Sequence, residues 1–340
     1  MIKLHPITQR RVQQFFANRL AAWSLYGFCI LTSVLLLSNW IANERPWIIY
    51  YENQWFFPIL KTYPGTDFGG IFATEAQYQD PIIKEKIQEK GWMIMPPIAY
   101  SFDTHDFYSN QPQPAPPSTK HWLGTDDQGR DILARILYGA RLSLIFGVCL
   151  TGLSLIVGVS VGAVQGYYGG TIDLFGQRFI EIWTGMPTLY LLIILSSLVR
   201  PSFFWLMLVM LLFGWVKFVG VVRAEFLRAR NLDYVNAAKS LGVSDRTIIF
   251  RHILPNALVA TITYLPWHVI SGIMSLSALD FLGFGMPIGS PSIGELIAQA
   301  KNNIHAPWIG LSVFVVMFIL LSLLIFIGEG MRDAIDPQRR

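Results

Sequence analysis

Long apolar runs alternate with polar and charged segments along the chain, and they predict membrane-spanning helices. The first run covers residues 22–42 and is long enough to cross the hydrocarbon core of a bilayer, which needs roughly 20 residues. Five further runs are separated by turn residues or charges: 142–164, 180–199, 204–222, 257–278 and 308–327. The pattern therefore predicts an all-α integral membrane protein with about six transmembrane helices.

The first run resembles a secretory signal in its position after a basic N-terminal segment. It is longer than the apolar part of such a signal, and the residues that follow it, Ser38, Asn39 and Trp40, do not form a small-residue cleavage site. We therefore expect residues 1–42 to contain a cytoplasmic N-terminus and a retained first helix.

The segment 43–141 is too polar and too rich in proline to lie in a membrane over most of its length. Its apolar stretch at 47–60 is interrupted by polar residues, and 111–117 has the composition of an extended proline-rich connector. We expect a periplasmic insert that contains a small ordered subdomain followed by a linker. The core of five helices then covers 142–330, and a cytoplasmic tail covers 331–340.

The distribution of Lys and Arg predicts the orientation. Arg200 and Lys301 are the only basic residues in the two short loops on one side, whereas the loops on the other side contain many. Cytoplasmic loops are enriched in these residues, so both termini are predicted to face the cytoplasm.

Composition supports a membrane protein and argues against a nucleic-acid partner. The 340 residues are 53% hydrophobic and 14% charged, compared with about 25% charged in soluble domains. The net charge of +4 comes from residues beside apolar runs and not from a basic polar surface. Cys29 and Cys149 both lie in apolar segments, which supports neither a disulfide framework nor a zinc site.

The motifs of common enzymes are absent from the sequence. No Gly-Lys dipeptide occurs, so the chain has no phosphate-binding loop of the usual kind. The six histidines show no metal-ligand spacing, and no nucleophile elbow is present. We expect no catalytic residue, no metal and no cofactor in this chain.

Three glycines, Gly158, Gly162 and Gly166, repeat every four residues along one run. This spacing places them on one helix face and allows another backbone to approach closely. Packing within this chain is the favoured interpretation, and a subunit or pore contact is the alternative.

Charged residues in or near the apolar runs are candidates for a transport path. Glu181 and Asp280 are the possible pore or gate residues, although each could also lie at a helix end in water. Lys217 lies near the predicted cytoplasmic end of its run, where its long side chain could extend to the membrane surface.

The predicted cytoplasmic segment 223–256 contains clear signals for helix starts and ends. Asp233 is a natural N-cap, a short helix follows, and Gly242 suits the left-handed residue that ends it. Ser244 is then predicted to cap a second short helix, and Pro255 lies at the entry to the next span. Local physics alone favours a connecting hairpin over a docking element, although Ala237 and Ala238 would present little bulk to a groove on another protein.

A resemblance to a known family favours the docking element over the connecting hairpin. Asn236-Ala237-Ala238, then Gly242 and finally Leu254-Pro255, is similar in spacing to the Glu-Ala-Ala loop of permease subunits of ABC importers. Asn236 and His252 depart from the family pattern. The resemblance implies a type I importer permease fold and an ATPase-coupling loop formed by Tyr234, Asn236, Ala237, Ala238, Leu241, Gly242, Leu254 and Pro255.

Further segments resemble the oligopeptide and dipeptide subgroup of these permeases. They include the run from His121 to Asp131, the segments at 166–170 and 281–285, and Arg332 to Pro337. The large insert resembles the Yej-type subunit that is associated with microcin C and oligopeptide uptake.

The resemblance implies several partners and a location. Two homologous permease subunits would pair around a pore, ABC ATPase subunits would bind ATP and Mg²⁺, and a periplasmic solute-binding protein would deliver the peptide. Membrane lipids would contact the spans and the basic loop. The expected location is the cell inner membrane of a Gram-negative bacterium.

Two other function classes stay open from the residues alone. An ion-coupled secondary transporter would need ionisable residues deep in the spans or broken helices at matched positions, and the sequence predicts neither. A membrane-anchored periplasmic binding module would use residues 43–120 as its working part.

Overall fold

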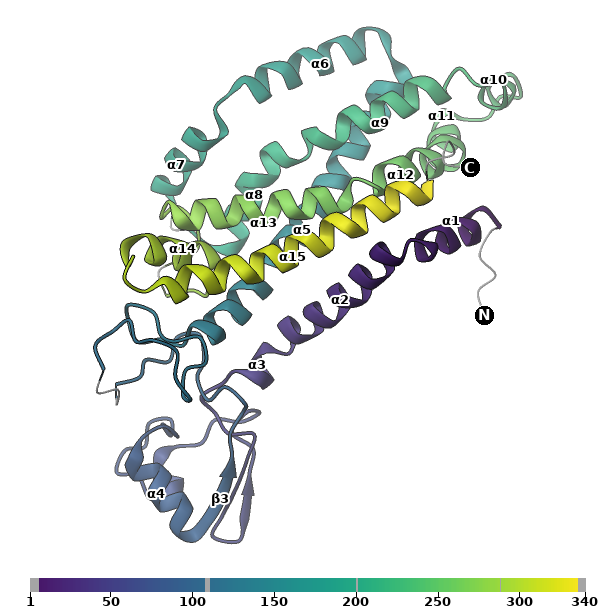
Figure 1. The fold of residues 1–340 in the computed structure, drawn as a ribbon. Coiled ribbons are helices and arrows are strands. Elements are labelled where there is room, and N and C mark those ends of the chain that lie inside the picture. The colour runs from purple at the N-terminus through teal and green to yellow at the C-terminus, as the bar shows by residue number, and fades with distance from the viewer. Residues whose placement is uncertain (1–5, 108–110, 200, 288, 336–340) are drawn as a thin grey trace. The chain divides into compact units, whose positions relative to one another are not determined.

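A computed structural model of the chain describes residues 6–107, 111–199, 201–287 and 289–335. It divides into two compact units, which are described separately (Figure 1). The helix unit comprises Met1–Phe28, Ser143–Pro287 and Ile319–Arg340. The insert unit comprises Cys29–Leu142 and Ile288–Phe318. The insert unit thus combines the residues after the first helix with a segment nearer the C-terminal end of the chain.

The insert unit contains a small sheet in the strand order β2-β1-β3, with all neighbours antiparallel. Strands β1 (Ile48–Tyr51) and β2 (Gln54–Phe56) are joined by Glu52 and Asn53, both with positive φ, as a two-residue hairpin turn requires. Strand β3 covers Gly91–Ile94. The all-α prediction did not include this sheet.

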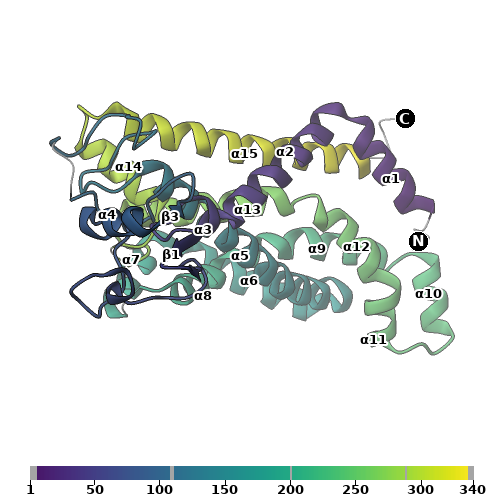
Figure 2. The ribbon, with the colours of Figure 1, turned by 90° about the horizontal axis from the view of Figure 1, so that it is seen from below.

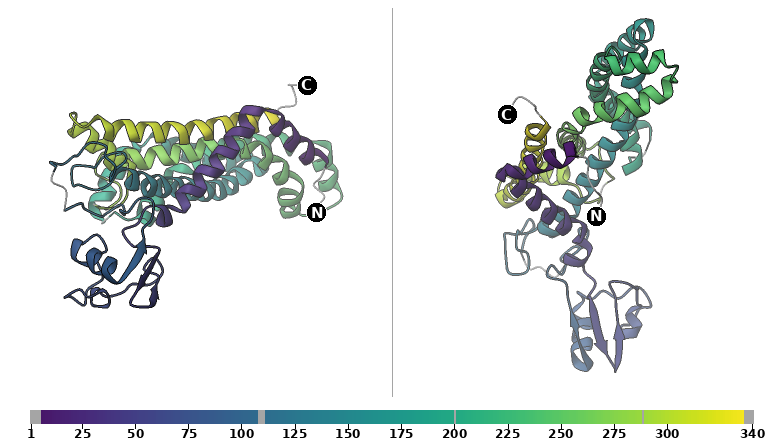
Figure 3. Two further views of the ribbon diagram at one scale, coloured as in Figure 1. Left: turned by 60° about the horizontal axis from the view of Figure 1, so that its bottom comes forward. Right: turned by 90° about the vertical axis from the view of Figure 1, so that its right-hand side faces the viewer.

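A helix and a short turn cover one face of the sheet (Figure 3). Helix α4 (Pro81–Lys90) begins after Asp80, whose side chain accepts a hydrogen bond from the Ile82 amide, and Pro81 occupies the first turn. The 3₁₀ turn η1 covers Gly65–Phe68. Phe68 and Ile87 are fully buried in the shared core, so the expected ordered subdomain has a core of its own.

The rest of the insert unit consists of helix ends and loops. It includes α3 (Ser38–Ile41), the first turns of α5 and the helix α14 (Ile293–Asn302). Helix α5 covers Ile132–Tyr168, so it begins ten residues before the predicted run at 142.

The helix unit contains the long apolar helices and several short ones (Figure 2). Its elements, some of which extend into the insert unit, are α1 (Pro6–Ala17), α2 (Arg19–Leu36), α5, α6 (Gly170–Gly185), α7 (Thr188–Leu198), α8 (Phe203–Gly214), α9 (Val216–Ala229), α10 (Asp233–Ser240), α11 (Asp245–Thr247), the π-helix η2 (Ile248–Ile253), α12 (Leu254–Ile262), α13 (Leu265–Phe281) and α15 (Pro307–Ile335). Helix α1 was not predicted. It ends before Asn18, whose side chain accepts hydrogen bonds from the amides of Leu20 and Ala21 at the start of α2.

Within the described residues, four helical segments are long and apolar enough to cross a membrane: Arg19–Leu36, Ile132–Tyr168, Phe203–Ala229 and Pro307–Ile335. A fifth is formed if Asp245–Ile262 and Leu265–Phe281, which meet at a bend of 56°, are one span. The predicted span at 180–199 is divided between α6 and α7 around Met186 and Pro187. The multi-pass prediction is confirmed, whereas the count of six stays a prediction.

Two of these features differ from the sequence interpretation. Helices are broken at Pro187 and before Leu265, although no broken span was expected. Proline explains the first break, because it lacks an amide donor and clashes with the carbonyl four residues earlier.

Candidate functional site

The loop between α9 and α12 folds as a short helical hairpin (Figure 2). Helix α10 begins directly after Leu232, which has an extended backbone, so Asp233 is the first helical residue and not the cap that the sequence suggested. Its carboxylate lies in the first turn, where the helix dipole favours negative charge. The side-chain amide of Asn236 donates to the Asn231 carbonyl over 3.3 Å, which ties α10 to the segment before it.

The end of α10 is fixed by a Schellman motif at Gly242. Its φ is +75°, its amide donates to the Lys239 carbonyl over 3.0 Å, and the Val243 amide donates to the Ala238 carbonyl over 3.0 Å. Val243 and Ala238 also pack in the same apolar cluster. Gly242 therefore has the left-handed conformation that the sequence predicted.

The second half of the hairpin joins the next long helix without a break. Helix α11 begins after Ser244, whose hydroxyl lies 2.9 Å from the Thr247 hydroxyl, and the chain then widens into the π-helix η2. Pro255 lies in the first turn of α12. A proline there removes one helical hydrogen bond and crowds the Arg251 carbonyl, and a π turn relieves both constraints.

Helix α10 has one buried face and one exposed face. Val235 and Ala238 are buried in a cluster with residues of α5, α9 and α12, and Ala238 is only 8% exposed. Tyr234, Ala237 and Leu241 lie at a spacing of three and four residues beside this buried face and are exposed, with Leu241 83% exposed. The expectation that Ala238 presents its small side chain to a partner is therefore corrected, because its methyl group faces the chain's own core.

The remaining residues of the predicted loop site are split between these faces. Asn236 and Gly242 are exposed, Leu254 packs partly against the buried cluster, and Pro255 is exposed at the start of α12. The exposed members other than Pro255 therefore lie on one short helix and the turn that follows it.

Tyr167 of α5 links the hairpin to the long helices. Its hydroxyl donates to the Asp245 carboxylate over 2.6 Å at the start of α11. The Lys239 ammonium lies 5.1 Å from the centre of the Tyr167 ring, and an Arg230 guanidinium nitrogen lies 3.4 Å from the Tyr167 carbonyl oxygen. These contacts connect both helices of the hairpin to one turn of α5.

A second link joins α9 to α6. The Arg223 guanidinium pairs with both carboxylate oxygens of Asp173, with Nη2 lying 2.6 Å from Oδ2. Fifty residues separate the two, so no local pattern could have indicated this pair. Tyr167, in contrast, lies in the aromatic and glycine segment at 166–170, although the sequence did not assign it a contact.

The three glycines of α5 lie against α9. A methyl group added at Gly158 would come within 2.6 Å of the Phe218 Cβ, and one added at Gly166 within 2.5 Å of the Phe226 Cβ. At Gly162 the nearest atom would be a carbonyl oxygen of α9, at 2.9 Å. This geometry corresponds to packing within the chain, and it holds the two helices at backbone distance.

The two candidate gate residues occupy different settings. Glu181 is exposed and pairs with Arg178 one turn earlier on α6 over 2.5 Å. Asp280 lies in the last turn of α13, and its carboxylate accepts a hydrogen bond from the Met286 amide over 2.7 Å. Asp280 thus fastens the turn after α13, and nothing in these contacts assigns either residue to a pore.

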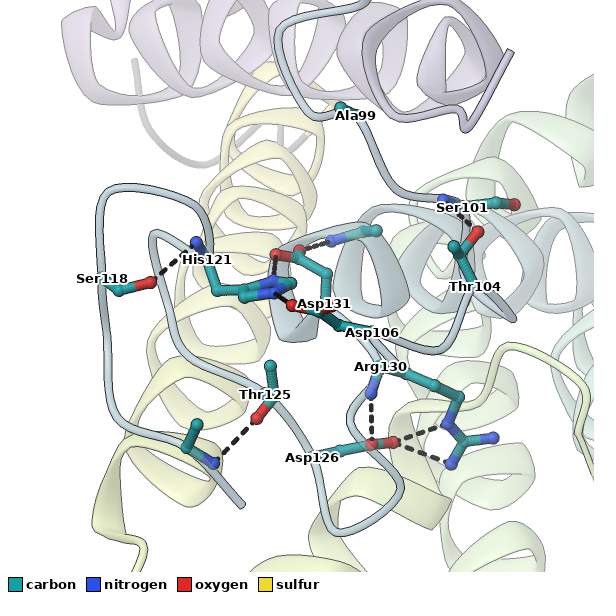
Figure 4. A network of polar contacts seen from close by, with 12 residues as sticks. Ala99, Ser101, Thr104, Asp106, Ser118, His121, Thr125, Asp126, Arg130 and Asp131 are labelled. Atoms are coloured by element: carbon teal, nitrogen blue, oxygen red, sulfur yellow. Dashed lines mark hydrogen bonds and ion pairs between the residues drawn. The ribbon is translucent and has the colours of Figure 1, made fainter. Parts of the chain in front are cut away.

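The motif from His121 to Asp131 forms a buried polar network in the insert unit (Figure 4). Arg130 lies 2.7 Å from the Asp126 carboxylate and 2.9 Å from Glu295 of α14, and Arg135 lies 2.9 Å from the same Glu295. The two buried guanidinium groups are thus paired with two carboxylates, because a buried charge is stable only when it is paired. The network fastens the start of α5 to α14.

His121 lies between two carboxylates beside this network (Figure 4). Its Nδ1 is 2.8 Å from Asp131 and its Nε2 is 3.2 Å from Asp106. Burial alone lowers the pKa of the imidazole, but the hydrogen bonds to Asp131 and Asp106 outweigh this effect and raise the pKa above its ordinary value. Among the residues described, no group of three or more His, Cys, Asp or Glu side chains is arranged to hold a metal ion.

Comparison with known proteins identifies related chains. Residues 155–340 match the family described as the binding-protein-dependent transport system inner membrane component. The chain is 55% identical over 339 residues to the inner membrane ABC transporter permease protein YejE of Escherichia coli, covering 100% of this chain and 99% of that protein.

Other relatives extend the similarity. The peptidoglycan transport system permease protein YejE of Agrobacterium fabrum is 49% identical, covering 98% of this chain and 94% of that protein. The oligopeptide transport system permease protein OppC of Mycobacterium tuberculosis is 34% identical, covering 74% of this chain and 86% of that protein. Among solved structures, a chain of the MetNI methionine ABC transporter in inward-facing conformations has a TM-score of 0.51 at 16% identity, covering 60% of this chain and 98% of that chain.

Proposed function

This chain belongs to the family of binding-protein-dependent transport system inner membrane components, and we propose that its α10 hairpin couples a peptide pathway through the membrane to a separate ATPase. The chain is a permease subunit of a peptide ABC importer with the type I permease fold, and it is not itself an enzyme. An ATPase and a solute-binding protein are partners that this class of permease requires.

The finer assignments are part of the same proposal. A second homologous permease subunit completes the pore, ATP and Mg²⁺ bind to the ATPase, and the substrates are oligopeptides or peptide-like compounds of the microcin C type. Both termini and the α10 hairpin face the cytoplasm of a Gram-negative bacterium, and the insert faces the periplasm. This orientation follows from the basic residues around the hairpin, which anionic lipids attract by about 1 kcal/mol each.

The exposed face of α10 supports this proposal most directly. Tyr234, Ala237 and Leu241 form an exposed apolar stripe beside the face by which the helix is anchored in the core. An amphipathic helix of this kind suits a groove on another protein, and the exposed leucine is the natural anchor.

The anchored face of α10 supplies the mechanical part of the proposal. Ala238 and Val235 pack on α5, α9 and α12, and Tyr167 holds Asp245, so α10 cannot move far without these helices. When the ATPase closes and its grooves approach, the hairpin therefore carries the attached helices with it. The resulting rearrangement alternates access to the peptide pathway between the two sides of the membrane.

Replacement of Leu241 with Asp tests the docking face. Because Leu241 is 83% exposed, the substitution leaves the fold intact, and it places a charge in an apolar groove. Loss of one such anchor costs about 2 kcal/mol, or roughly thirtyfold in affinity. We expect the variant to insert into the membrane normally, to lose co-purification with the ATPase and to lose ATP-dependent peptide uptake.

Ile304 offers a matched control because it is 84% exposed and lies in the insert unit. Ile304→Asp makes the same chemical change away from the hairpin, so ATPase binding should be retained. Equal ATPase binding by the Leu241 and Ile304 variants would contradict the docking proposal.

A further inference from the structure

Lys217 lies in the middle of an apolar helical segment. The candidate span Phe203–Ala229 places it 14 residues from one end and 12 from the other, about 21 Å and 18 Å along the helix at 1.5 Å per residue. The charged residues Arg223, Glu225 and Arg228 lie in the last turns of this segment, so its apolar part ends six residues after Lys217, about 9 Å along the helix.

Lys217 has a hydroxyl partner and, among the described residues, no ion pair. Its ammonium group donates to the Ser271 hydroxyl of α13 over 2.9 Å, and no carboxylate lies within 4.0 Å of it among the described residues. A cation among apolar helices is stabilised by water, a polar cavity or an anion. Lys217 is exposed in the isolated chain, so its free side is open to such a partner.

A cavity of about 170 Å³ adjoins Lys217 between α5, α7, α8, α9 and α13. Its lining is mostly apolar, but it also includes hydroxyl side chains and one imidazole: Thr151, Ser154, Thr188, Ser271, Ser275 and His268. The volume has room for several water molecules or one small polar group. The lining thus offers hydrogen-bond donors in a segment of otherwise apolar helices.

Two of these hydroxyls are buried without a partner. Thr151 is 5% exposed and Ser154 is 3% exposed, and neither hydroxyl forms a hydrogen bond. Hydroxyls on membrane helices usually bond to the carbonyl four residues earlier, as Ser160 does on the same helix. Each of these residues therefore has an unused hydrogen-bonding group beside the cavity.

Gly214 of α8 makes room for Ser154. A methyl group at Gly214 would come within 2.6 Å of the Ser154 hydroxyl oxygen. A larger residue there would displace this hydroxyl from the cavity wall.

We propose that the cavity beside Lys217, the Lys217 pocket, binds a carboxylate group of the peptide during its passage through the membrane. The inference rests on the proposed importer function and specifies which chemical group this chain recognises. Lys217, Ser271, Thr151 and Ser154 can all donate hydrogen bonds, and the cationic ammonium group adds charge, a combination that suits an anionic oxygen ligand. Every unmodified peptide has a C-terminal carboxylate, so one pocket serves peptides of different sequences.

Uptake of paired peptides tests the proposal. The complete importer, with its ATPase, partner permease and solute-binding protein, is reconstituted in liposomes with wild-type or Lys217→Met permease. Two peptides of one sequence are compared, one with a free C-terminal carboxylate and one amidated. The other subunits are identical in both preparations, so their own selectivity cancels when each variant rate is divided by the wild-type rate for the same peptide.

We expect Lys217→Met to reduce uptake of the free acid about tenfold and uptake of the amide less than twofold, and we expect Lys217→Arg to retain most uptake of both. Equal losses for the two peptides would overturn the proposal and would indicate instead an ion pair with the partner permease or a folding defect. Unchanged uptake of the free acid would also overturn it.

A separate comparison shows whether the proposed importer function itself has failed. The Leu241→Asp variant should reduce uptake of both peptides equally, because it uncouples the ATPase. A wild-type complex that carries neither peptide with ATP would refute the importer function, whereas normal wild-type uptake with no peptide discrimination in Lys217→Met refutes the Lys217 pocket alone.

Discussion

The contact between α5 and α9 leads to a graded prediction for Ala substitutions at the glycines of α5. An added methyl group would lie 2.5 Å from the Trp215 carbonyl oxygen at position 158 and 2.5 Å from the Phe226 Cβ at position 166. At position 162 the nearest atom would be 2.9 Å away. Gly152, on the same helix, has no atom within 4 Å of the added methyl group.

These distances set the expected magnitudes. Nonbonded heavy atoms are comfortable at about 3.5–4.0 Å, so Gly158→Ala and Gly166→Ala have to move the helices apart by about 1 Å. Gly162→Ala needs roughly half of that displacement. Overpacking of this kind costs about 1–3 kcal/mol, so we expect the larger costs at 158 and 166 and the smaller cost at 162. The Gly152→Ala variant should be unchanged or slightly stabilised, because alanine favours the helix.

Unfolding of the purified chain in mixed micelles tests the predicted ranking of the four Ala substitutions. Increasing amounts of a denaturing detergent are added, and the loss of tertiary structure is followed by tryptophan fluorescence. Helices persist in such unfolded states, so the measurement reports helix packing more than helix propensity. A midpoint for Gly166→Ala equal to that of Gly152→Ala would refute the close packing of α5 on α9.

Two further predictions concern polar contacts. Tyr167→Phe removes the hydrogen bond to Asp245, which should cost about 1 kcal/mol of stability. We expect peptide uptake to fall severalfold while the ATPase still co-purifies with the variant. Unchanged uptake would show that the link is dispensable. The His121 pKa is raised in the folded chain by Asp131 and Asp106, so its contribution to stability is fully present below about pH 6.5 and is lost as pH rises through the folded value. The thermal midpoint should therefore fall above neutral pH in wild type more than in His121→Gln, and parallel curves for the two would contradict this account.

The sequence predicted the hairpin well because its signals are local. Gly242 has the left-handed backbone that a helix end requires, and Pro255 does mark the entry to the next helix. Capping and turn preferences act over a few residues, so they can be read from the chain directly.

Face assignment within the hairpin was less successful because burial depends on distant partners. Ala237 and Ala238 are adjacent and identical in type, yet the first is exposed and the second packs against α5, α9 and α12. Small size suits both a groove on another protein and a tight core, so composition could not separate the two.

Helix ends could not be read from the sequence for a related reason. Hydropathy reports where a helix is apolar and not where it ends, and amphipathic turns extend α9 to Ala229, beyond the apolar run that ended at 222.

The two ends of α9 connect the proposed sites. Lys217 lies in the first turn of α9, and α10 follows its last turn after a short connection. Between them, the glycine contacts hold α9 against α5 at backbone distance, so these two helices should move together. Ser271, the present partner of Lys217, belongs to α13 instead, and the 56° bend after α12 separates α13 from the hairpin. However, Gly272 of α13 also lies at backbone distance from Gly147 of α5, so all three helices are packed together around the Lys217–Ser271 bond. A displacement of α10 that is passed to α9 is therefore expected to move α5 and α13 with it, and the bond between Lys217 and Ser271 is expected to persist.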